Sequence, residues 1–244
     1  MKNPEALQTL QNWVAESDNI VFFGGAGVST ESGIPDFRSV DGLYSQKFRY
    51  PPETMLSHTF YVHHTEEFFQ FYRDKLLPLD YDPNPAHVKL AELEKAGKVK
   101  AIVTQNVDGL HEKAGSKAIY NLHGTVYRNT CQSCGKHYDG LEGALLIKNA
   151  PGIPRCSCGG IIKPDVVLYE EGLDEETLDG AIRAIAKADV LIVGGTSLTV
   201  YPAAGLLQYY RGHKLVLINR DPTSMDRKAD LVLRDPIGEV FAAL

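Results

Sequence analysis

Short, continuous apolar runs recur along the chain and are the clearest sign of its architecture. Runs of this kind are typical of strands that are buried on both faces of a parallel sheet. We therefore predict strands at residues 20–23, 101–103, 118–120, 190–193, 215–218 and 231–233.

Helical patterns lie before, between and after several of these runs. Pro4 suits the first position of a helix that Asn3 can cap, and apolar residues recur on one of its faces. Pro85 begins another predicted helix and Gly97 ends it, 174–176 begins a third, and 202–212 holds a fourth. Strands that alternate with helices predict an α/β fold with a Rossmann-like, doubly wound parallel sheet.

Two stretches interrupt this alternation and are predicted to form a smaller lobe. Residues 36–83 are rich in aromatic side chains and helical in pattern, whereas 125–164 are rich in glycine and cysteine. We expect the large Rossmann-like lobe to comprise the remaining residues, 1–35, 84–124 and 165–244.

Composition excludes several classes of protein. The 244 residues are 43% hydrophobic and 23% charged, which excludes disordered, collagen-like and coiled-coil proteins. A net charge of −6 disfavours nucleic acid as a direct partner. No run approaches the roughly 18 apolar residues of a membrane span, and 1–20 lacks the pattern of a secretory signal. We therefore expect a cytoplasmic protein that does not bind membranes.

A glycine-rich turn follows the first predicted strand. Gly25 and Gly27 would let the backbone approach a pyrophosphate, whose charge would sit on the following amides and helix N-terminus. Thr30 occupies the position of a third glycine in a dinucleotide fingerprint. From these residues alone, a tight turn without a ligand remains an equal alternative.

Polar residues follow other predicted strands at the edge where open α/β sheets bind ligands. Gln105, Asn106 and Asp108 come after the second strand, although an Asx turn at Asp108 is an open alternative. His123 is expected to end the strand that begins near 118, where its imidazole could accept a proton at neutral pH. We expect structural support from His111, and surface or capping positions for His58, His63, His64, His87 and His213.

The four cysteines form two close pairs. Cys131 and Cys134 are separated by two residues, and Cys156 and Cys158 by one. The number of residues between the two pairs is close to that in four-thiolate zinc ribbons. Two disulfides are the minor alternative. Because four thiolates leave no position for water, we expect a structural and not a catalytic zinc ion.

Taken together, these motifs resemble those of the sirtuins, the NAD-dependent protein deacylases. Residues 25–38 (GAGVSTESGIPDFR) are similar to the family's opening signature. The resemblance continues, in the family's order, through 104–111 (TQNVDGLH), 123–124 (HG), the cysteine pairs, 195–198 (GTSL) and Asn219.

The resemblance implies roles for individual residues. It makes His123 the general base and Asn106 a second catalytic residue, which with Gln105 orders the ribose and a nearby water. It places the nicotinamide carboxamide against Asp108 and the backbone of Val107. Arg38 would pair with the pyrophosphate and Phe37 would shield the reactive sugar carbon. The other NAD-binding residues that it implies are Gly25, Ala26, Gly27, Ser29, Thr30, Gln105, Gly195, Thr196, Ser197, Asn219 and Ile237.

The acyl-lysine substrate is expected beside residues 166–171. By resemblance, Val167 and Tyr169 line its tunnel, although Glu170 stands where the family usually has glycine. A plain edge strand is the alternative. Members that remove acidic acyl groups carry Tyr and Arg where this chain has Phe69 and Tyr72, so an uncharged acyl group, acetyl first, is expected.

The resemblance therefore implies a deacetylase that acts on acetyl-lysine proteins or peptides. It would consume NAD, transfer the acyl group to ADP-ribose and release nicotinamide and O-acetyl-ADP-ribose. Another NAD-consuming enzyme, an ADP-ribosyltransferase or glycohydrolase, is the first alternative, and a binding module without turnover is the second.

Overall fold

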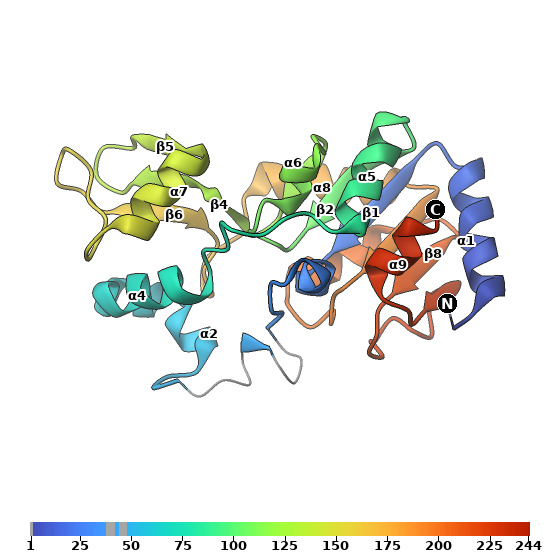
Figure 1. The fold of residues 1–244 in the computed structure, drawn as a ribbon, viewed down its shortest axis with the longest axis horizontal. Coiled ribbons are helices and arrows are strands. Elements are labelled where there is room, and N and C mark those ends of the chain that lie inside the picture. Colours follow the sequence, from blue (N-terminus) through green and yellow to red (C-terminus); the bar gives the residue numbers. More distant parts are fainter. Residues whose placement is uncertain (1, 38–41, 44–47) are drawn as a thin grey trace.

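The computed structural model describes residues 2–37, 42–43 and 48–244 and contains the predicted parallel sheet (Figure 1). Its six strands lie in the order β3-β2-β1-β7-β8-β9, and all neighbouring pairs are parallel. The chain builds one side of the sheet first and the other later, so the order reverses between β1 and β7. The strands are β1 (Ile20–Gly24), β2 (Val99–Thr104), β3 (Ile119–Asn121), β7 (Val190–Gly194), β8 (Leu215–Ile218) and β9 (Leu231–Leu233).

Both faces of this sheet are covered by helices, as a doubly wound fold requires. Alternate residues of β1 belong to two apolar clusters, Phe22 to one and Phe23 to the other. The first cluster includes α1 (Pro4–Glu16), α5 (Pro85–Lys95) and α9 (Ile237–Ala242). The second includes α8 (Glu175–Lys187) and η4 (Ala203–Tyr209).

Local signals explain where most of these helices begin. The Asn3 side chain accepts from the Ala6 amide at 3.0 Å, and Asp174 caps α8 through the Thr177 amide at 2.8 Å. The predicted helix at 202–212 is instead the 3-10 helix η4. The predicted strands β3 and β9 are only partly buried, because they form the two edges of the sheet.

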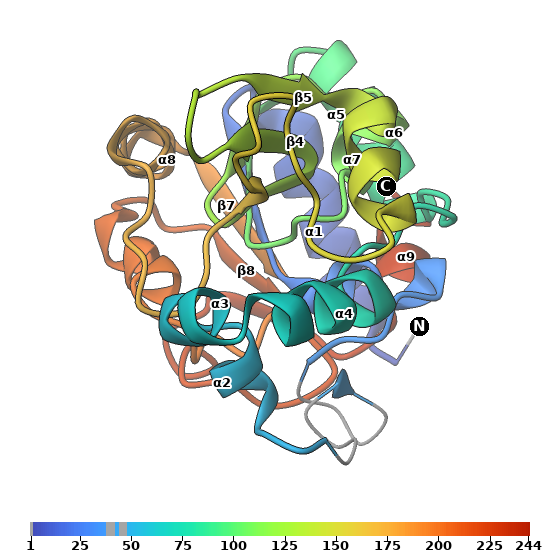
Figure 2. The ribbon, with the colours of Figure 1, turned by 90° about the vertical axis from the view of Figure 1, so that its left-hand side faces the viewer.

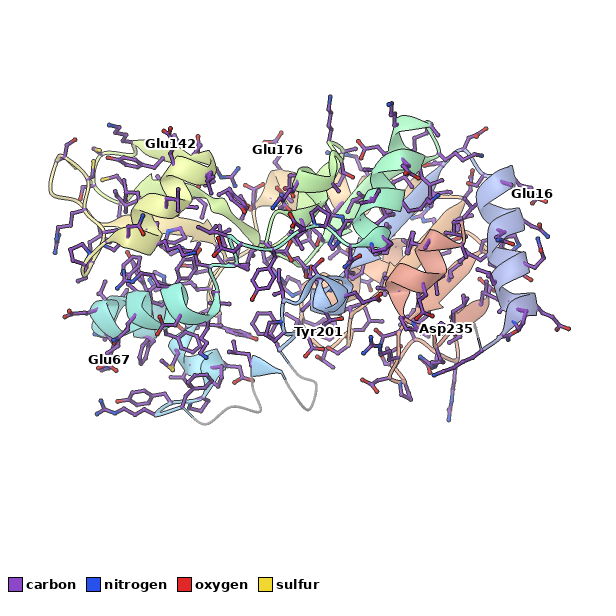
Figure 3. The ribbon with its side chains drawn as sticks, viewed as in Figure 1. Glu16, Glu67, Glu142, Glu176, Tyr201 and Asp235 are labelled. Atoms are coloured by element: carbon purple, nitrogen blue, oxygen red, sulfur yellow. The ribbon has the colours of Figure 1, made fainter. Side chains whose placement is uncertain are left out.

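Elements within 52–75 and 124–166 build a second, smaller lobe, which lies at the left of Figure 1 and towards the viewer in Figure 2. In its antiparallel sheet β4 (Gly124–Cys131) lies between β5 (His137–Asp139) and β6 (Ile162–Val166). The helical insertion contributes α2 (Pro52–Met55), α3 (His58–His63) and α4 (Thr65–Lys75), and α7 (Gly140–Asn149) is a helix that the sequence pattern did not predict. One apolar cluster joins these helices to the sheet.

A short helix, α6 (Leu110–Ala114), lies directly after the polar residues that follow β2. No helix within the described residues is long and apolar enough to cross a membrane.

Candidate active site and metal centre

The predicted glycine turn lies where the strand order of the large sheet reverses. Gly24 of β1 pairs with Gly194 of β7, and the Gly27 amide donates to the Gly195 carbonyl at 2.8 Å. A Cβ at Gly27 would lie 2.9 Å from the Gly195 Cα, so this crossing requires glycine. In open α/β sheets, ligands bind in the crevice at such a switch point.

The residues after this turn differ from the expected helix N-terminus. Ala26–Val28 (η1) and Thr30–Ser32 (η2) are 3-10 turns, so no α-helix begins here. The Thr30 hydroxyl donates to the Gly27 carbonyl at 3.0 Å and closes the turn at the position of the missing third glycine. An anion bound at this turn would therefore meet loop amides and not the end of an α-helix.

A buried hydrogen-bond network joins this loop to the end of β2. The Ser29 hydroxyl donates to Asp108 Oδ2 at 2.6 Å, and Asn106 Nδ2 donates to Ser29 Oγ at 3.1 Å. Asp108 Oδ1 accepts from the Leu110 amide at 2.9 Å, which forms the Asx turn considered above. The Asx turn uses Oδ1 and the hydrogen bond from Ser29 uses Oδ2. The turn therefore does not prevent Asp108 from also belonging to the network at the crevice.

Asp108 is 6% exposed, and this burial changes the acidity of its carboxyl. Burial raises the pKa of Asp108, although hydrogen bonds from Ser29 and Leu110 act in the opposite direction. A carboxyl held in this way presents a fixed polar group to a ligand in the crevice.

His123 lies between the two sheets. It comes two residues after β3 ends and directly before β4, and so does not itself end a strand as predicted. Its Nδ1 is 2.9 Å from the Gln105 carbonyl, which can only accept, so Nδ1 carries the proton and Nε2 is left as a base. Burial lowers the pKa of His123, and the hydrogen bond to Gln105 partly opposes this. The imidazole is therefore neutral at pH 7.

Further hydrogen bonds connect the ends of three strands. Gln105 Nε2 donates to Thr196 Oγ1 at 3.0 Å, and the Thr196 amide donates to Asn219 Oδ1 at 3.1 Å. The structure thereby brings together predicted site residues that follow β1, β2, β7 and β8.

Other predicted NAD-binding residues make contacts outside this hydrogen-bond network or are not described. Ser197 is exposed and hydrogen-bonded to Thr199, and Ile237 begins α9 with its side chain near Gly194. Phe37 and Val107 pack against the apolar cluster of the small lobe. Arg38 lies outside the described residues.

The predicted substrate segment is fixed at several points. The Val167 amide donates to the His123 carbonyl at 2.9 Å, which ties the segment to the candidate base. The Tyr169 amide donates to the Leu56 carbonyl and its carbonyl accepts from the His58 amide, both at 3.0 Å. The segment is therefore not a plain edge strand, because the helical insertion already occupies one edge of Tyr169.

Two residues near the site had no role in the sequence analysis. Asn84 Nδ2 donates to the Val28 carbonyl at 2.7 Å and to Ser32 Oγ at 3.1 Å, which holds the loop after β1 from outside. The Glu31 carboxylate accepts from the Gly238 amide at 2.9 Å, linking that loop to α9. Asn84 precedes Pro85 as a helix cap, and Glu31 lies within 25–38, but neither signal indicates its distant partner.

Two fully buried histidines lie in α5 and α6. His87 completes the capping box of α5, as a capping position predicts, but it is not on the surface. Its ring centroid is 4.8 Å from that of His111, whose nitrogens have no hydrogen-bond partner among the described residues. Burial lowers the pKa of His87 to about 4 and, together with the neighbouring imidazole, that of His111 to about 3.

The four cysteines meet at the end of the small sheet. Their sulfur atoms all lie within 4.8 Å of one another, and all four thiols are free, so the disulfide alternative is wrong. Cys131 Sγ is 3.5 Å from Cys158 Sγ, and Cys134 Sγ is 3.7 Å from Cys156 Sγ. A tetrahedral zinc ion with bonds of about 2.3 Å sets neighbouring sulfurs about 3.8 Å apart, so the cluster fits zinc.

Backbone turns allow the short second pair to reach the cluster. The Gly159 amide donates to the Cys156 carbonyl at 2.8 Å, and Gly159 has a φ of 87°. The Tyr138 hydroxyl also donates to Cys156 Sγ at 3.1 Å, a contact that the sequence analysis did not foresee.

The fold and the site together define a nucleotide-binding α/β protein with a second, cysteine-containing lobe. The Sir2 family model matches residues 25–202. The chain is 60% identical over 240 residues to a Clostridium acetobutylicum protein named NAD-dependent protein deacetylase, with 97% of each covered. It therefore belongs to the Sir2 family.

Solved structures of the family agree with this assignment. A Sir2 homologue in complex with NAD has a TM-score of 0.86 and 39% identity, covering 96% of this chain and 91% of that one. A Sir2 protein with a deacetylated peptide and 3'-O-acetyl ADP-ribose has a TM-score of 0.88 and 36% identity, covering 97% and 96%.

Proposed function

We propose that the chain is an NAD-dependent protein-lysine deacetylase that transfers the acetyl group to ADP-ribose. Its membership of the Sir2 family and the name of the relative at 60% identity support this activity. The family structures with NAD and with a deacetylated peptide support the two substrates, because they cover nearly the whole chain. NAD is consumed, and nicotinamide and O-acetyl-ADP-ribose are released.

The first step needs NAD to be held in one orientation. We assign Asp108 and the Val107 backbone to the nicotinamide carboxamide, and Asn106 and Gln105 to the ribose and a nearby water. The acetyl oxygen then attacks the ribose carbon, and the bond from that carbon to nicotinamide breaks. The buried Ser29–Asp108–Asn106 network supports this assignment, because it fixes these side chains before substrate arrives.

The observation that carries the proposal is the orientation of His123. Because Nδ1 donates to Gln105, Nε2 can take the proton of a ribose hydroxyl. The freed oxygen bonds to the acyl carbon, and the lysine leaves as a free amine. A water molecule then adds to the acyl carbon, whose bond to the oxygen on the first ribose carbon breaks, so that this carbon keeps a hydroxyl and the acetyl group stays on the neighbouring ribose oxygen. We therefore assign His123 as the base of the second step.

The remaining assignments concern the rest of NAD and the acyl-lysine. We place the pyrophosphate and adenosine against Gly25, Ala26, Gly27, Ser29, Thr30, Phe37, Arg38, Gly195, Thr196, Ser197, Asn219 and Ile237. We place the acyl-lysine against Val167 and Tyr169.

An uncharged acyl group is the proposed substrate. Phe69 and Tyr72 of α4 are fully buried and carry no cation that could pair with an acidic acyl group. Arg73, the next residue, donates to the Gly152 carbonyl at 2.9 Å. Acetyl-lysine is therefore the first substrate to test.

Zinc and location complete the proposal. The four thiolates would close the metal's shell, so bound zinc would hold the small lobe together. We retain 1–35, 84–124 and 165–244 as the NAD-binding lobe, with 36–83 and 125–164 as insertions. Four free thiols and a net charge of −6 support a cytoplasmic protein that acts on proteins and not directly on nucleic acid.

The test is mass spectrometry of an acetyl-lysine peptide with the purified protein, with and without NAD. We expect the acetyl group to leave only with NAD and to reappear on ADP-ribose. His123→Ala should abolish this transfer while NAD binding persists. Cleavage of NAD with the peptide untouched would instead establish a glycohydrolase or transferase.

A further inference from the structure

A cavity of about 530 Å³ lies between the helical insertion and the end of the proposed substrate segment. Tyr169 and Glu170 form one side of it, and residues near α2 and α3 form the other. A peptide whose acyl-lysine lies against Val167 and Tyr169 would pass this cavity. None of the site residues proposed above except Tyr169 contributes to its lining.

Aromatic rings form much of its wall. Tyr50 packs edge-on against Phe60 with centroids 5.5 Å apart, and His64 stacks on Phe60 at 4.8 Å. The Arg49 guanidinium lies 5.3 Å from the Tyr50 ring centroid, so one of these rings already contacts a cation. Rings of this kind attract cations through their faces.

The carboxylates that line the cavity outnumber the cation beside it, which is Arg49 at the Tyr50 ring, and His63 and His64 also belong to the lining. Glu53 and Glu170 line it, and its described lining contains no Lys or Arg. The neighbouring Glu171 is directed elsewhere, since its carboxylate accepts from the Leu168 amide, His58 and Lys163. Of the two adjacent glutamates, Glu170 therefore lines the cavity, whereas Glu171 is hydrogen-bonded within the protein.

Glu170 also adopts a costly backbone conformation. Its φ is 76°, in the left-handed region that glycine adopts freely and that costs other residues about 1–2 kcal/mol. Its carboxylate accepts from the Thr59 amide at 2.8 Å, which a neutral amide oxygen could do equally well. The Thr59 side chain and amide, with nearby His58, lower the pKa of Glu170, so a carboxylate held at the first turn of α3 is charged where it lines the cavity.

We propose that this cavity is a specificity subsite that binds a Lys or Arg side chain of the protein substrate, close in sequence to the acetyl-lysine. The aromatic wall would contact the aliphatic stem and the cation, while Glu53 and Glu170 would pair with its charge. This inference rests on the proposed deacetylase function and adds a preference that the function alone does not require.

Peptides that differ in one charge test the subsite. Each would carry a central acetyl-lysine in a neutral background, with Arg or its neutral isostere citrulline at one flanking position. We expect kcat/KM to favour Arg about fivefold at one position, the size that a partly exposed ion pair and a cation–π contact allow. The preference should shrink as salt is added, because exposed charges are screened.

Variants then locate the preference. Glu170→Gln keeps an oxygen for the Thr59 amide and removes only the charge, and Glu53→Gln removes the other charge. Each should lower the Arg-to-citrulline ratio towards one. Glu66→Gln is the matched control, because Glu66 is exposed on α4 and does not line the cavity. It should leave the ratio unchanged.

Three outcomes would overturn the inference. If Arg and citrulline peptides react equally at every position, the subsite does not exist, whereas the deacetylase function stands. If the preference survives both glutamine substitutions, it arises elsewhere. If no acetylated peptide reacts at all, the proposed function fails and the subsite fails with it.

Discussion

Ser29 and Asp108 are joined by a 2.6 Å hydrogen bond, although they are 79 residues apart in the chain. Ser29 is 1% exposed and lies in the loop after β1, and Asp108 lies in the turn after β2. The same hydroxyl accepts from Asn106. One small side chain thus orients two of the groups proposed to hold NAD.

Removing this hydroxyl should impair the reaction more than the fold. Ser29→Ala leaves Asp108 Oδ2 and Asn106 Nδ2 without their partner in a buried site. Hydrogen bonds to charged groups contribute about 1.5–3 kcal/mol, so we expect kcat/KM to fall roughly 10- to 100-fold. Nicotinamide release measures this directly.

A distant hydroxyl provides the control for this variant. Thr9→Val removes an exposed hydroxyl whose hydrogen bond lies within α1, to the Glu5 carbonyl. It should leave nicotinamide release unchanged. A Ser29→Ala enzyme with normal nicotinamide release would show that the network does not orient NAD.

The pH dependence should reflect a histidine that resists protonation. Burial lowers the pKa of His123 below its ordinary value of 6.5. The neutral base therefore predominates at and above pH 6.5, and activity that depends on it is lost only at lower pH. We expect an NMR titration of His123, assigned with His123→Asn, to have its midpoint below 6.5. A midpoint above 6.5 would contradict the assigned environment.

The large sheet could be predicted closely because buried parallel strands leave little choice of sequence. All residues of β7 are buried, so both faces of the strand require apolar side chains and the run is easy to recognise. Its predicted bounds differ from the observed ones by one residue. Helix α7 was not predicted because Gly140 and Gly143 interrupt the apolar pattern that is typical of a helix. Gly143 is needed where a Cβ would lie 2.1 Å from the Tyr138 carbonyl, a contact that no local signal reveals.

The same limit applies to the candidate site. Motifs predicted that residues following β1, β2, β7 and β8 would lie together, because these strands end at the same edge of one sheet. They did not predict the contacts that hold them, such as Asn84 with the Val28 carbonyl, since 56 residues separate the two partners. Nor did they indicate that Glu170 would turn towards a cavity.

Zinc retention should depend on a tyrosine outside the thiolate shell. The Tyr138 hydroxyl donates to Cys156 Sγ at 3.1 Å, and such outer contacts typically change metal affinity about 10- to 100-fold. Tyr138→Phe should therefore lose zinc to a chelator at a lower chelator concentration than the unmodified protein. Tyr209→Phe, at a partly exposed tyrosine of the large lobe, should not. Equal zinc retention in all three proteins would exclude this role.

Acid should destabilise the fold through the buried His87–His111 pair. Their folded pKa values, about 4 and about 3, lie below the unfolded value near 6.5. Between about pH 6.5 and these values, the unfolded chain therefore binds more protons at the two histidines than the folded chain does. The free energy of unfolding is fully retained above about pH 6.5 and falls towards pH 4 by up to about 1.4 kcal/mol per pH unit for each histidine.

Substituting one member of the pair should flatten this dependence. His111→Phe keeps a ring against Phe22 and His87 but removes one titrating group, so its unfolding free energy should fall less steeply below pH 6.5. His213→Phe, at an exposed histidine, should keep the slope of the unmodified protein. Urea unfolding at several pH values, with zinc content checked at each because acid also protonates thiolates, gives the comparison. Identical slopes in all three proteins would show that His111 takes up protons as readily in the folded chain as in the unfolded chain.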